Sequence, residues 1–400
     1  VVNTSLFQTD WYIDQMKRKA YESDPIPSQL THDNYKYGTN DYVIKENVIR
    51  DTLEIKEALN FISSDHPRTK YQYILQQKGV DLAQVRAQDL NANYLPTEFL
   101  KLSVNKENAV KNAIVKSEDA HKIEDTIYLR VKGNALYKNR LLMLDIVANN
   151  DWKRPIYFTG GSFGDDDYIW MKDYLQLDGM CYKLVPIRTP VDRANPFDMG
   201  RVDSDLMYEK VKNWDWGNSG SSEIYHDVET RKNSITYRGN LARLIEQLIN
   251  EEKLDKAEEI ADIAMTNMPV DYFGYYTLLE PYISAYYEVG NKEKGRALFK
   301  EVSKIYQENI LYYSGLDKDD QIRLIEDIYL DIQRYRALVD ILFVYQDKEF
   351  AMEEMKKYNN FLSLLDEFLG PDEDEVEPLN DIDINTILKD SIQDAIAPEE

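Results

Sequence analysis

Hydrophobic and polar positions repeat with two different periods along this chain, and the period changes near residue 233. Before that point, short apolar runs with alternating spacing lie between helical patterns, which is typical of mixed α and β structure. After it, apolar residues recur every three or four positions, which predicts helices alone. The pattern predicts an α+β or α/β domain over residues 1–232, an all-α tetratricopeptide-like helical-repeat domain over residues 233–370, and a tail over residues 371–400.

The N-terminal domain combines predicted strands, predicted helices and long loops. Strands are predicted at residues 1–7, 99–104, 126–131, 155–159 and 180–187, and helices at residues 10–19, 53–63, 106–114, 139–149 and 166–175. The long loops span residues 22–42, 64–97 and 188–203. Loops of this length inside a compact domain are usually functional or cover something. Because the first run is β-branched and lacks a preceding Met, we expect the chain to begin inside a strand of a longer protein.

The helical domain contains two similar hairpins. The first ends its second helix at Pro269, and the second turns at Gly290 and Asn291. Aligning Ala257 with Gly295 places a small residue at the close helix contact of each hairpin, with a spacing of 38 residues. A standard tetratricopeptide repeat has about 34 residues. The pattern therefore predicts a degenerate repeat pair, followed by two further helices.

Aromatic residues mark two places in this half of the chain. Trp214 and Trp216 lie near the predicted domain boundary, and because large rings need burial we predict an interface there. A dense group of tyrosines exceeds what one helix face can bury, so we predict a groove that anchors a peptide or protein partner. The groove candidates are Tyr275, Tyr276, Tyr282, Tyr286 and Tyr287.

Charge and composition exclude several classes of partner. The chain has 72 acidic against 48 basic residues, a formal net charge of −24, which disfavours nucleic acid and anionic lipid as main partners. No apolar run is long enough to span a membrane, so we expect membrane association only through a part upstream of this segment. The tail is acidic and most simply disordered, although residues 384–396 fit a short helix that docks in the tyrosine groove.

Six sequence blocks carry a resemblance to a known family. They are residues 1–15, 38–42, 132–139, 142–146, 151–161 and 177–186. In this order they resemble the C-terminal, non-membrane region of the Bacteroidetes protein O-mannosyltransferase-like membrane proteins, glycosyltransferase family 117. The resemblance implies an upstream membrane portion that holds the catalytic carboxylate, and a place at the cell inner membrane with the soluble part facing the periplasm. No residue of this chain matches that catalytic element.

The first candidate site lies at the predicted transition from strand to helix at residue 9. Asp10, Trp11, Tyr12 and Asp14 follow a predicted strand, and ligands collect at the carboxyl ends of strands in α/β sheets. Trp11 offers a flat face for a sugar ring. The structural alternative, which we favour, is that Thr9 or Asp10 caps the helix and Trp11 belongs to the core.

The second candidate site is a glycine-rich turn. Gly160 and Gly161 follow a predicted strand and precede a predicted helix, where backbone N–H groups can hold a phosphate. The acidic residues at 165–167 would repel a phosphate, so a divalent cation or a plain turn with a helix cap are the alternatives. Arg154 at the strand entrance is interpreted as a structural, paired arginine in preference to an anion site.

These patterns favour a binding module over an enzyme. The four histidines have no metal-ligand spacing and no nucleophile motif occurs, so the sequence predicts no catalytic residue, no metal and no cofactor in this chain. The leading hypothesis is a module that positions an acceptor or partner protein near the active site of a membrane glycosyltransferase-like protein. One alternative is a helical-repeat binding scaffold of the cell envelope unrelated to sugar transfer. Another is a self-sufficient enzyme that uses Asp10 or Gly160.

Overall fold

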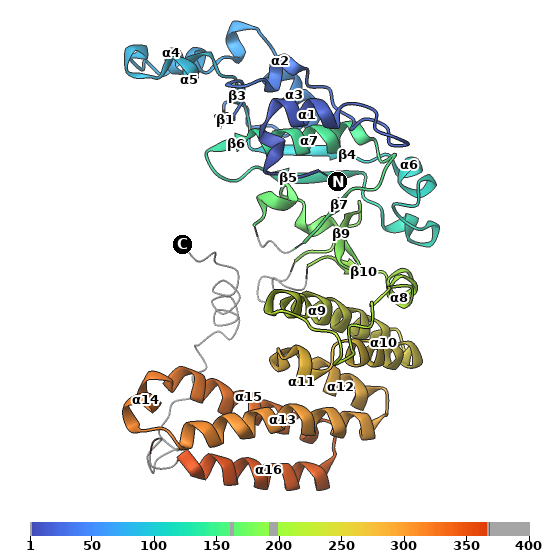
Figure 1. Cartoon of the computed structure of the whole chain (residues 1–400). Coiled ribbons are helices and arrows are strands. Elements are labelled where there is room, and N and C mark those ends of the chain that lie inside the picture. The colour runs from blue at the N-terminus through green and yellow to red at the C-terminus, as the bar shows by residue number, and fades with distance from the viewer. Residues whose placement is uncertain (1, 161–163, 192–198, 366–367, 369–400) are drawn as a thin grey trace. The chain divides into compact units, whose positions relative to one another are not determined.

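The chain forms two compact units. The computed structural model describes residues 2–160, 164–191, 199–365 and 368 (Figure 1). The first unit comprises Val1–Leu177 and Cys181–Arg201, and the second comprises Asp178–Met180 and Val202–Glu400. Short helices and small sheets alternate in the first unit, whereas the described part of the second is mainly helical. The predicted order, a mixed region followed by a helical one, is therefore confirmed.

The helical unit begins earlier than the predicted boundary at residue 232. Helix α8 (Ser204–Lys212) belongs to it, and two ion pairs join α8 to α10 (Leu254–Asn267) and to the residue that precedes α10. The Lys253 Nζ lies 2.8 Å from Asp205 Oδ2, and the Lys212 Nζ lies 3.0 Å from Glu259 Oε1. Charged contacts between separate helices leave no periodic signal in the sequence, so the pattern placed α8 with the preceding unit.

Among the residues that the structure describes, the strands of the mixed region form three small sheets rather than one wound sheet. Their orders are β3-β1-β6, β2-β4-β5 and β10-β8-β9-β7. The strands are β1 (Tyr42–Lys45), β2 (Leu53–Glu54), β3 (Tyr94–Leu95), β4 (Phe99–Ser103), β5 (Thr126–Arg130), β6 (Ala135–Tyr137), β7 (Tyr157–Phe158), β8 (Leu175–Asp178), β9 (Cys181–Leu184) and β10 (Arg201–Val202). The helices are α1 (Asp10–Met16), α2 (His32–Tyr35), α3 (Ile55–Ile62), α4 (Tyr71–Gln77), α5 (Ala87–Asn91), α6 (Lys106–Lys111) and α7 (Lys138–Asn150).

Buried and exposed side chains alternate along the antiparallel strands β4 and β5, as the sequence pattern predicts. Leu100 pairs with Leu129, and both point into the core. Tyr128, between the buried Ile127 and Leu129, is 63% exposed. One face of this sheet is therefore apolar and covered, while the other presents aromatic and charged side chains, as expected for a half-buried antiparallel sheet.

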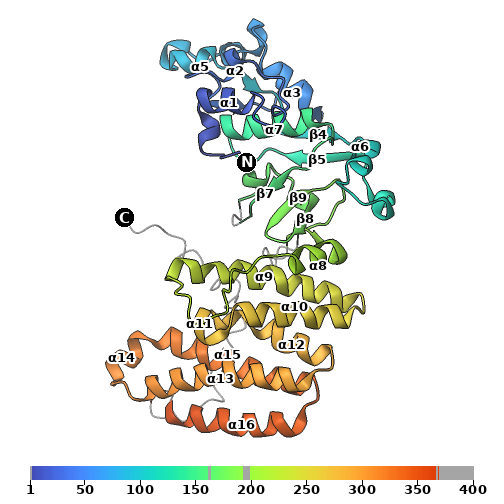
Figure 2. The same cartoon turned by 45° about the vertical axis from the view of Figure 1, so that its right-hand side comes forward.

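Helix α7 is the centre of the first unit. It lies between the β4–β5 sheet and helices α1 and α3 in both views (Figures 1 and 2). Its apolar residues are buried almost all round the helix, as expected for a helix covered on several sides. Leu141, Leu142 and Leu144 are each at most 1% exposed.

Two charged side chains of α7 are buried together with this apolar surface. Asp145, 0% exposed, accepts a hydrogen bond from the Ser28 hydroxyl, one of 3.0 Å from the Gln29 N–H and one of 2.8 Å from the Asn149 side chain. Lys138, 1% exposed, donates to the Tyr35 carbonyl at 3.0 Å and pairs with Asp41. The two residues thus hold the predicted long loop at residues 22–42 against α7.

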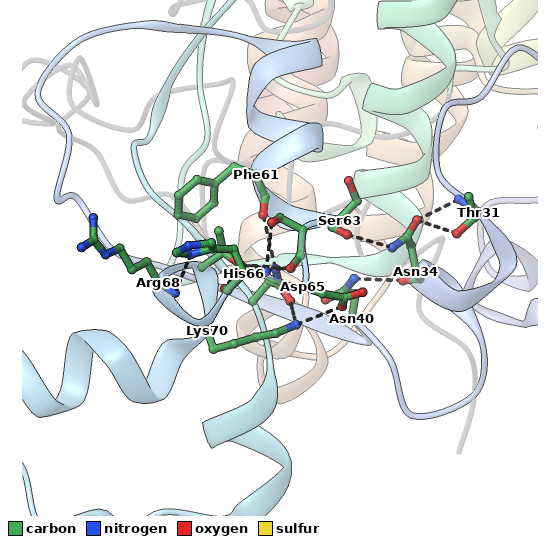
Figure 3. A network of polar contacts seen from close by, with 12 residues as sticks. Thr31, Asn34, Asn40, Phe61, Ser63, Asp65, His66, Arg68 and Lys70 are labelled. Carbon is green, nitrogen blue, oxygen red and sulfur yellow. Dashed lines mark hydrogen bonds and ion pairs between the residues drawn. The ribbon is translucent and has the colours of Figure 1, made fainter.

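The second predicted long loop, residues 64–97, is not a continuous loop, because it contains α4, α5 and β3. Side-chain hydrogen bonds to backbone carbonyls hold this segment in place. The buried Asn93 amide donates to the Phe61 carbonyl at 3.3 Å and to the Ser64 carbonyl at 2.9 Å, and its oxygen accepts from Lys70 at 2.8 Å. Figure 3 shows the Lys70 ammonium pointing toward Asp65, at 3.8 Å. The polar residues of this segment therefore serve to fix its own path.

The helical unit is a succession of helices that pack on their neighbours in sequence (Figure 2). After α8 these are α9 (Val228–Asn250), α10 (Leu254–Asn267), α11 (Val270–Phe273), α12 (Glu280–Glu288), α13 (Lys292–Ser314), α14 (Lys318–Arg323), α15 (Ile325–Val344) and α16 (Lys348–Leu362). Helix α10 ends two residues before Pro269, as the pattern predicts. Asp227 and Asn291 cap α9 and α13 by accepting backbone N–H bonds three residues on.

The small residues aligned in the two hairpins lie at buried helix contacts. Ala257 on α10 is 0% exposed. Gly295 on α13 faces the Tyr287 ring of α12, and a Cβ at Gly295 would lie only 2.9 Å from Tyr287 Cε2. The absence of a side chain at residue 295 therefore creates the space in which Tyr287 is buried.

The two tryptophans near the predicted boundary are half-buried within the helical unit. Trp214 and Trp216 contact each other with ring centroids 5.5 Å apart, and both contact Tyr237 of α9. These contacts cover only part of each indole, and the predicted interface at the two tryptophans stays a prediction.

Two predicted elements of the first unit are wrong. The expected strand at residues 1–7 is replaced by a 3₁₀ turn, Leu6–Gln8, because the Asn3 side chain accepts the N–H groups of Ser5 and Leu6 at 3.0 and 3.1 Å. The expected helix at residues 166–175 is interrupted, because Ile169 and Trp170 both adopt left-handed backbone conformations.

The predicted acidic tail, its helix at 384–396, residue 1 and Gly161 lie outside the described residues.

Replacing Asp145 by alanine tests the buried contacts of α7. The substitution leaves the Ser28 hydroxyl and the Gln29 N–H buried without their acceptor, so we expect the free energy of unfolding to fall by about 2–3 kcal/mol. Urea unfolding of the chain, monitored by circular dichroism, gives this value. Asp125→Ala is the matched control, because the Asp125 side chain is 91% exposed in its ion pair with Lys106, and it should change stability by less than about 0.5 kcal/mol. Equal effects of the two substitutions would contradict the assignment.

Glycine-to-alanine substitutions on two helices separate helix propensity from packing. Gly295→Ala forces the Tyr287 ring to move, so we expect a net loss of about 1–3 kcal/mol. Gly239 in α9 has no atom within 4 Å of the added Cβ, so Gly239→Ala should stabilise the unit by up to about 1 kcal/mol. Thermal unfolding of the two variants measures the difference, and a stabilised Gly295→Ala variant would show that the contact with Tyr287 is not tight.

Candidate functional site

The residues predicted at the start of α1 serve mainly to fix local backbone. The Asp10 carboxylate accepts the Trp11 N–H at 2.7 Å and the Tyr37 N–H at 3.3 Å. Tyr12 is buried, and its hydroxyl accepts the Asn3 N–H at 2.8 Å. Trp11 is 57% exposed, so the interpretation of Trp11 as a core residue is wrong. Its ring has one aromatic neighbour among the described residues, Tyr12, at 5.7 Å.

Asp14 forms a small polar cluster with the loop that α7 anchors. It accepts a hydrogen bond of 2.8 Å from the Tyr35 hydroxyl and lies 3.0 Å from His32 Nδ1. Partial burial favours a higher pKa for Asp14, but the bonds from Tyr35 and His32 outweigh it and lower the pKa below its usual range. Asp14 is therefore a charged group that joins α1 to α2.

The residues of the second predicted site have separate partners in the structure. The Arg154 guanidinium donates to the Asp24 and Pro25 carbonyls at 3.1 and 3.0 Å, in agreement with the structural interpretation of this residue. Gly160 has a left-handed φ of 79° that suits a turn. The carboxylates that follow pair with two basic residues, Asp165 with Lys132 and both Asp166 and Asp167 with Arg140.

Burial removes most of the predicted tyrosine groove. Tyr282, Tyr286 and Tyr287 are each at most 6% exposed, and their hydroxyls donate to the Arg238 carbonyl, to Asp262 and to Asp347. Burial raises the pKa of Tyr286. Tyr275 and Tyr276 are partly exposed. Three of the five rings are buried because neighbouring helices cover α12 from more than one side, and a partner groove at Tyr275 and Tyr276 stays a prediction.

A cleft in the first unit brings together Asp165, one of the acidic residues after the glycine-rich turn, and ten residues that the sequence did not predict as site residues. Its volume is about 470 Å³. The outer face of β5 supplies Tyr128 and Arg130, and Lys132 follows the strand. The segment 165–174 supplies the opposite side, and the segments before β5 and after β9 supply one charged residue each. The lining residues are Glu124, Tyr128, Leu129, Arg130, Lys132, Asp165, Trp170, Lys172, Asp173, Tyr174 and Arg188.

Each acidic residue in the cleft has a donor beside it. The Tyr174 hydroxyl donates to Glu124 at 2.8 Å, and this carboxylate, together with burial, raises the pKa of Tyr174. Lys132 lies 2.5 Å from Asp165, and Arg188 lies 3.6 Å from Asp173. The cleft is thus lined by hydrogen-bonding groups of both signs, and such groups set the orientation of a polar ligand.

An unfavourable backbone conformation places Trp170 in the cleft wall. Ile169 and Trp170 have φ values of 47° and 58°, a region that costs roughly 1–3 kcal/mol for such residues. The Ile169 side chain is fully buried, whereas Trp170 is half-buried and lines the cleft. The 2.8 Å bond from the Trp170 N–H to the Asp165 carbonyl holds this turn closed.

The same part of the chain is matched by one protein family. The model of the TMEM260-associated domain 2 family matches residues 1–206, about half of the chain. The chain belongs to this family. No curated protein and no solved structure matches the chain. The family is related to protein O-mannosyltransferases, so the resemblance in the sequence blocks is confirmed at this coarser level.

The TMEM260-associated domain 2 match covers the whole first unit, which ends at Arg201, and all residues of the cleft. Within the described residues, no group of three or more His, Cys, Asp and Glu side chains is arranged to hold a metal ion. Across the same residues, no helix has both the length and the apolar content that a membrane span requires.

Several cleft residues left a signal in the sequence. Tyr128 and Arg130 are the outward positions of a predicted strand, so the alternation at residues 126–131 already places them on one exposed face. Trp170 and Lys172 were assigned to a predicted helix and were therefore missed. Their convergence on β5 depends on the left-handed turn at 169–170, which the sequence pattern does not reveal.

Proposed function

We propose that this chain is the part of a membrane glycosyltransferase-like protein that holds the acceptor or a partner protein, while sugar transfer takes place elsewhere in that protein. The match to the TMEM260-associated domain 2 family carries the proposal, because this family is related to glycosyltransferases. The resemblance to the Bacteroidetes glycosyltransferase family 117 adds the setting, an inner-membrane protein with this region facing the periplasm and attached through a membrane portion.

The cleft is the proposed binding site of the first unit. Its three carboxylates are each engaged by a tyrosine, lysine or arginine, so they suit ligand orientation better than proton transfer. Asp10, the acidic residue first considered for catalysis, is also committed, to two backbone N–H groups. These contacts support a binding role for the described part of the unit.

The helical unit supports a second candidate function, a protein-binding scaffold of the cell envelope unrelated to sugar transfer. The observation that favours it is the pair of hairpins, α9 with α10 and α12 with α13, whose close contacts place Ala257 and Gly295 at equivalent positions. We interpret this pair as a degenerate tetratricopeptide-like repeat. Such arrays commonly bind a peptide or protein segment.

A sugar-transfer assay tests the proposal that this chain binds the acceptor or partner while transfer takes place elsewhere in the protein. The purified chain, incubated with a pool of lipid-linked sugars and peptide acceptors, should transfer no sugar, because the catalytic element lies outside it. A membrane fraction with protein O-mannosyltransferase activity, assayed in parallel, shows that donor and acceptor are competent. Mass spectrometry of the peptides measures the product. Transfer by the chain that Asp10→Ala abolishes would disprove the proposal.

Glycosylation of acceptor proteins in the cells that make this protein is a second test of the proposed function. Under the proposed function, Arg188→Ala in the cleft should lower the glycosylation of acceptor proteins, whereas Lys153→Ala should not, since Lys153 is an exposed residue outside the cleft. Unchanged glycosylation in both variants would favour the scaffold alternative.

A further inference from the structure

The charge of the cleft differs from that of the chain as a whole. Acidic residues outnumber basic residues by 72 to 48 in the full sequence. In the cleft lining the balance is reversed, with four basic residues, Arg130, Lys132, Lys172 and Arg188, against three acidic ones. A concave site of this sign in an acidic protein attracts a ligand with negative charge.

Lys172 is the least solvated of these cations. Its ammonium lies 5.6 Å from the centre of the Tyr168 ring, and burial lowers its pKa, with Asp165 and Lys132 acting in opposite directions. An anionic group in the cleft would favour the charged form of Lys172. The site is therefore better suited to a ligand anion than to a neutral ligand.

Aromatic rings add a flat surface to the same cleft. Tyr128 is 63% exposed on the outer face of β5, and Trp170 forms part of the opposite side. Asp151 and Trp152 form another left-handed pair. Trp152 is 5% exposed and belongs to the core, whereas Trp170 is left half-buried in the cleft wall.

The carboxylates narrow the ligand class further. Glu124, Asp165 and Asp173 accept hydrogen bonds, so a ligand that enters must present donors as well as a negative charge. A bare phosphate ion has no apolar face that could lie against the aromatic rings of the cleft. A sugar ring has hydroxyl donors and an apolar face of C–H groups that fits an aromatic ring.

We infer that the cleft binds an acidic saccharide, that is, a sugar ring that carries a carboxylate or a phosphate. The ring lies against Tyr128 and Trp170, its hydroxyls donate to the carboxylates, and its anionic group lies among Lys132, Lys172 and Arg188. The cleft volume of about 470 Å³ falls within the range of small-ligand sites, roughly 300–1,000 Å³. This inference rests on the proposed role of the cleft as the binding site of the first unit.

Titration of the whole chain with small sugars, followed by NMR, tests the inference. Glucuronic acid and glucose 6-phosphate are the acidic probes, and glucose and inorganic phosphate are their partial counterparts. We expect the acidic sugars to bind about tenfold more tightly than glucose, because a charge-assisted hydrogen bond is lost with the anion. They should also bind more tightly than phosphate, which lacks the ring.

Two cleft variants and two matched controls locate the binding site. Arg188→Ala and Tyr128→Ala change side chains that are 54% and 63% exposed, so both variants should fold, and each should weaken glucuronic acid about fivefold or more. Lys153→Ala and Tyr137→Ala are the controls, with exposures of 68% and 60% outside the cleft, and they should leave the affinity unchanged. Circular dichroism confirms that all four variants are folded.

Three results would overturn the inference: equal affinity for glucose and glucuronic acid, equal affinity for phosphate and glucose 6-phosphate, or the same affinity in the cleft variants and the controls. Binding of an acidic peptide alone, with the same dependence on Arg188 and Tyr128, would also overturn it and leave the proposed acceptor-holding function intact. Failure of the proposed function appears separately, as sugar transfer by the chain itself.

Discussion

The first unit depends on two charges buried on one helix. Lys138 and Asp145 of α7 are nearly inaccessible to solvent; Lys138 donates hydrogen bonds to the segment 28–41, and Asp145 accepts hydrogen bonds from it. An uncompensated buried charge is strongly unfavourable, so this segment has to follow the surface of α7. The apolar residues of α7 make the core, but they do not distinguish one loop path from another. The contacts of Lys138 and Asp145 do distinguish one loop path from another. Asp14 contacts Tyr35 and His32 of the same segment, and these contacts set the position of α1 relative to α2.

This arrangement changes the interpretation of the family resemblance. The blocks at 38–42, 132–139 and 142–146 contain Asp41, Lys138 and Asp145, the residues that fix the loop. These blocks therefore identify the family through its scaffold. Most of the chemistry of the cleft comes from positions outside these three blocks, such as Tyr128 and Trp170, although Lys132 is the first residue of the block at 132–139. Membership of the TMEM260-associated domain 2 family consequently establishes the framework, while a ligand has to be argued from the cleft itself.

The helical unit shows how aromatic residues are used when helices stack. Tyr287 enters the space left by Gly295, and its hydroxyl reaches Asp347, which is also paired with Arg296. Tyr282 and Tyr286 are buried in the same way, each with its hydroxyl bonded. A high tyrosine content in this unit thus serves packing with satisfied polar ends, and a partner surface cannot be inferred from the number of tyrosines alone.

The sequence by itself determined the elements whose pattern is local. Helical periodicity, Pro269 and the turn at Gly290 and Asn291 predicted α9, α10, α12 and α13. Alternation predicted β4 and β5, because these features depend on neighbours a few residues away. It also showed the family blocks. Only the tertiary structure decided which polar residues meet. Asp145 is buried against Ser28, and the tyrosines of α12 are buried against other helices, so both depend on partners distant in the chain. The turn that places Trp170 in the cleft depends on a backbone conformation that no residue type in the sequence indicates. The same reason explains the error at residues 1–7, where one asparagine side chain captured two backbone N–H groups and overrode an apolar, β-branched pattern.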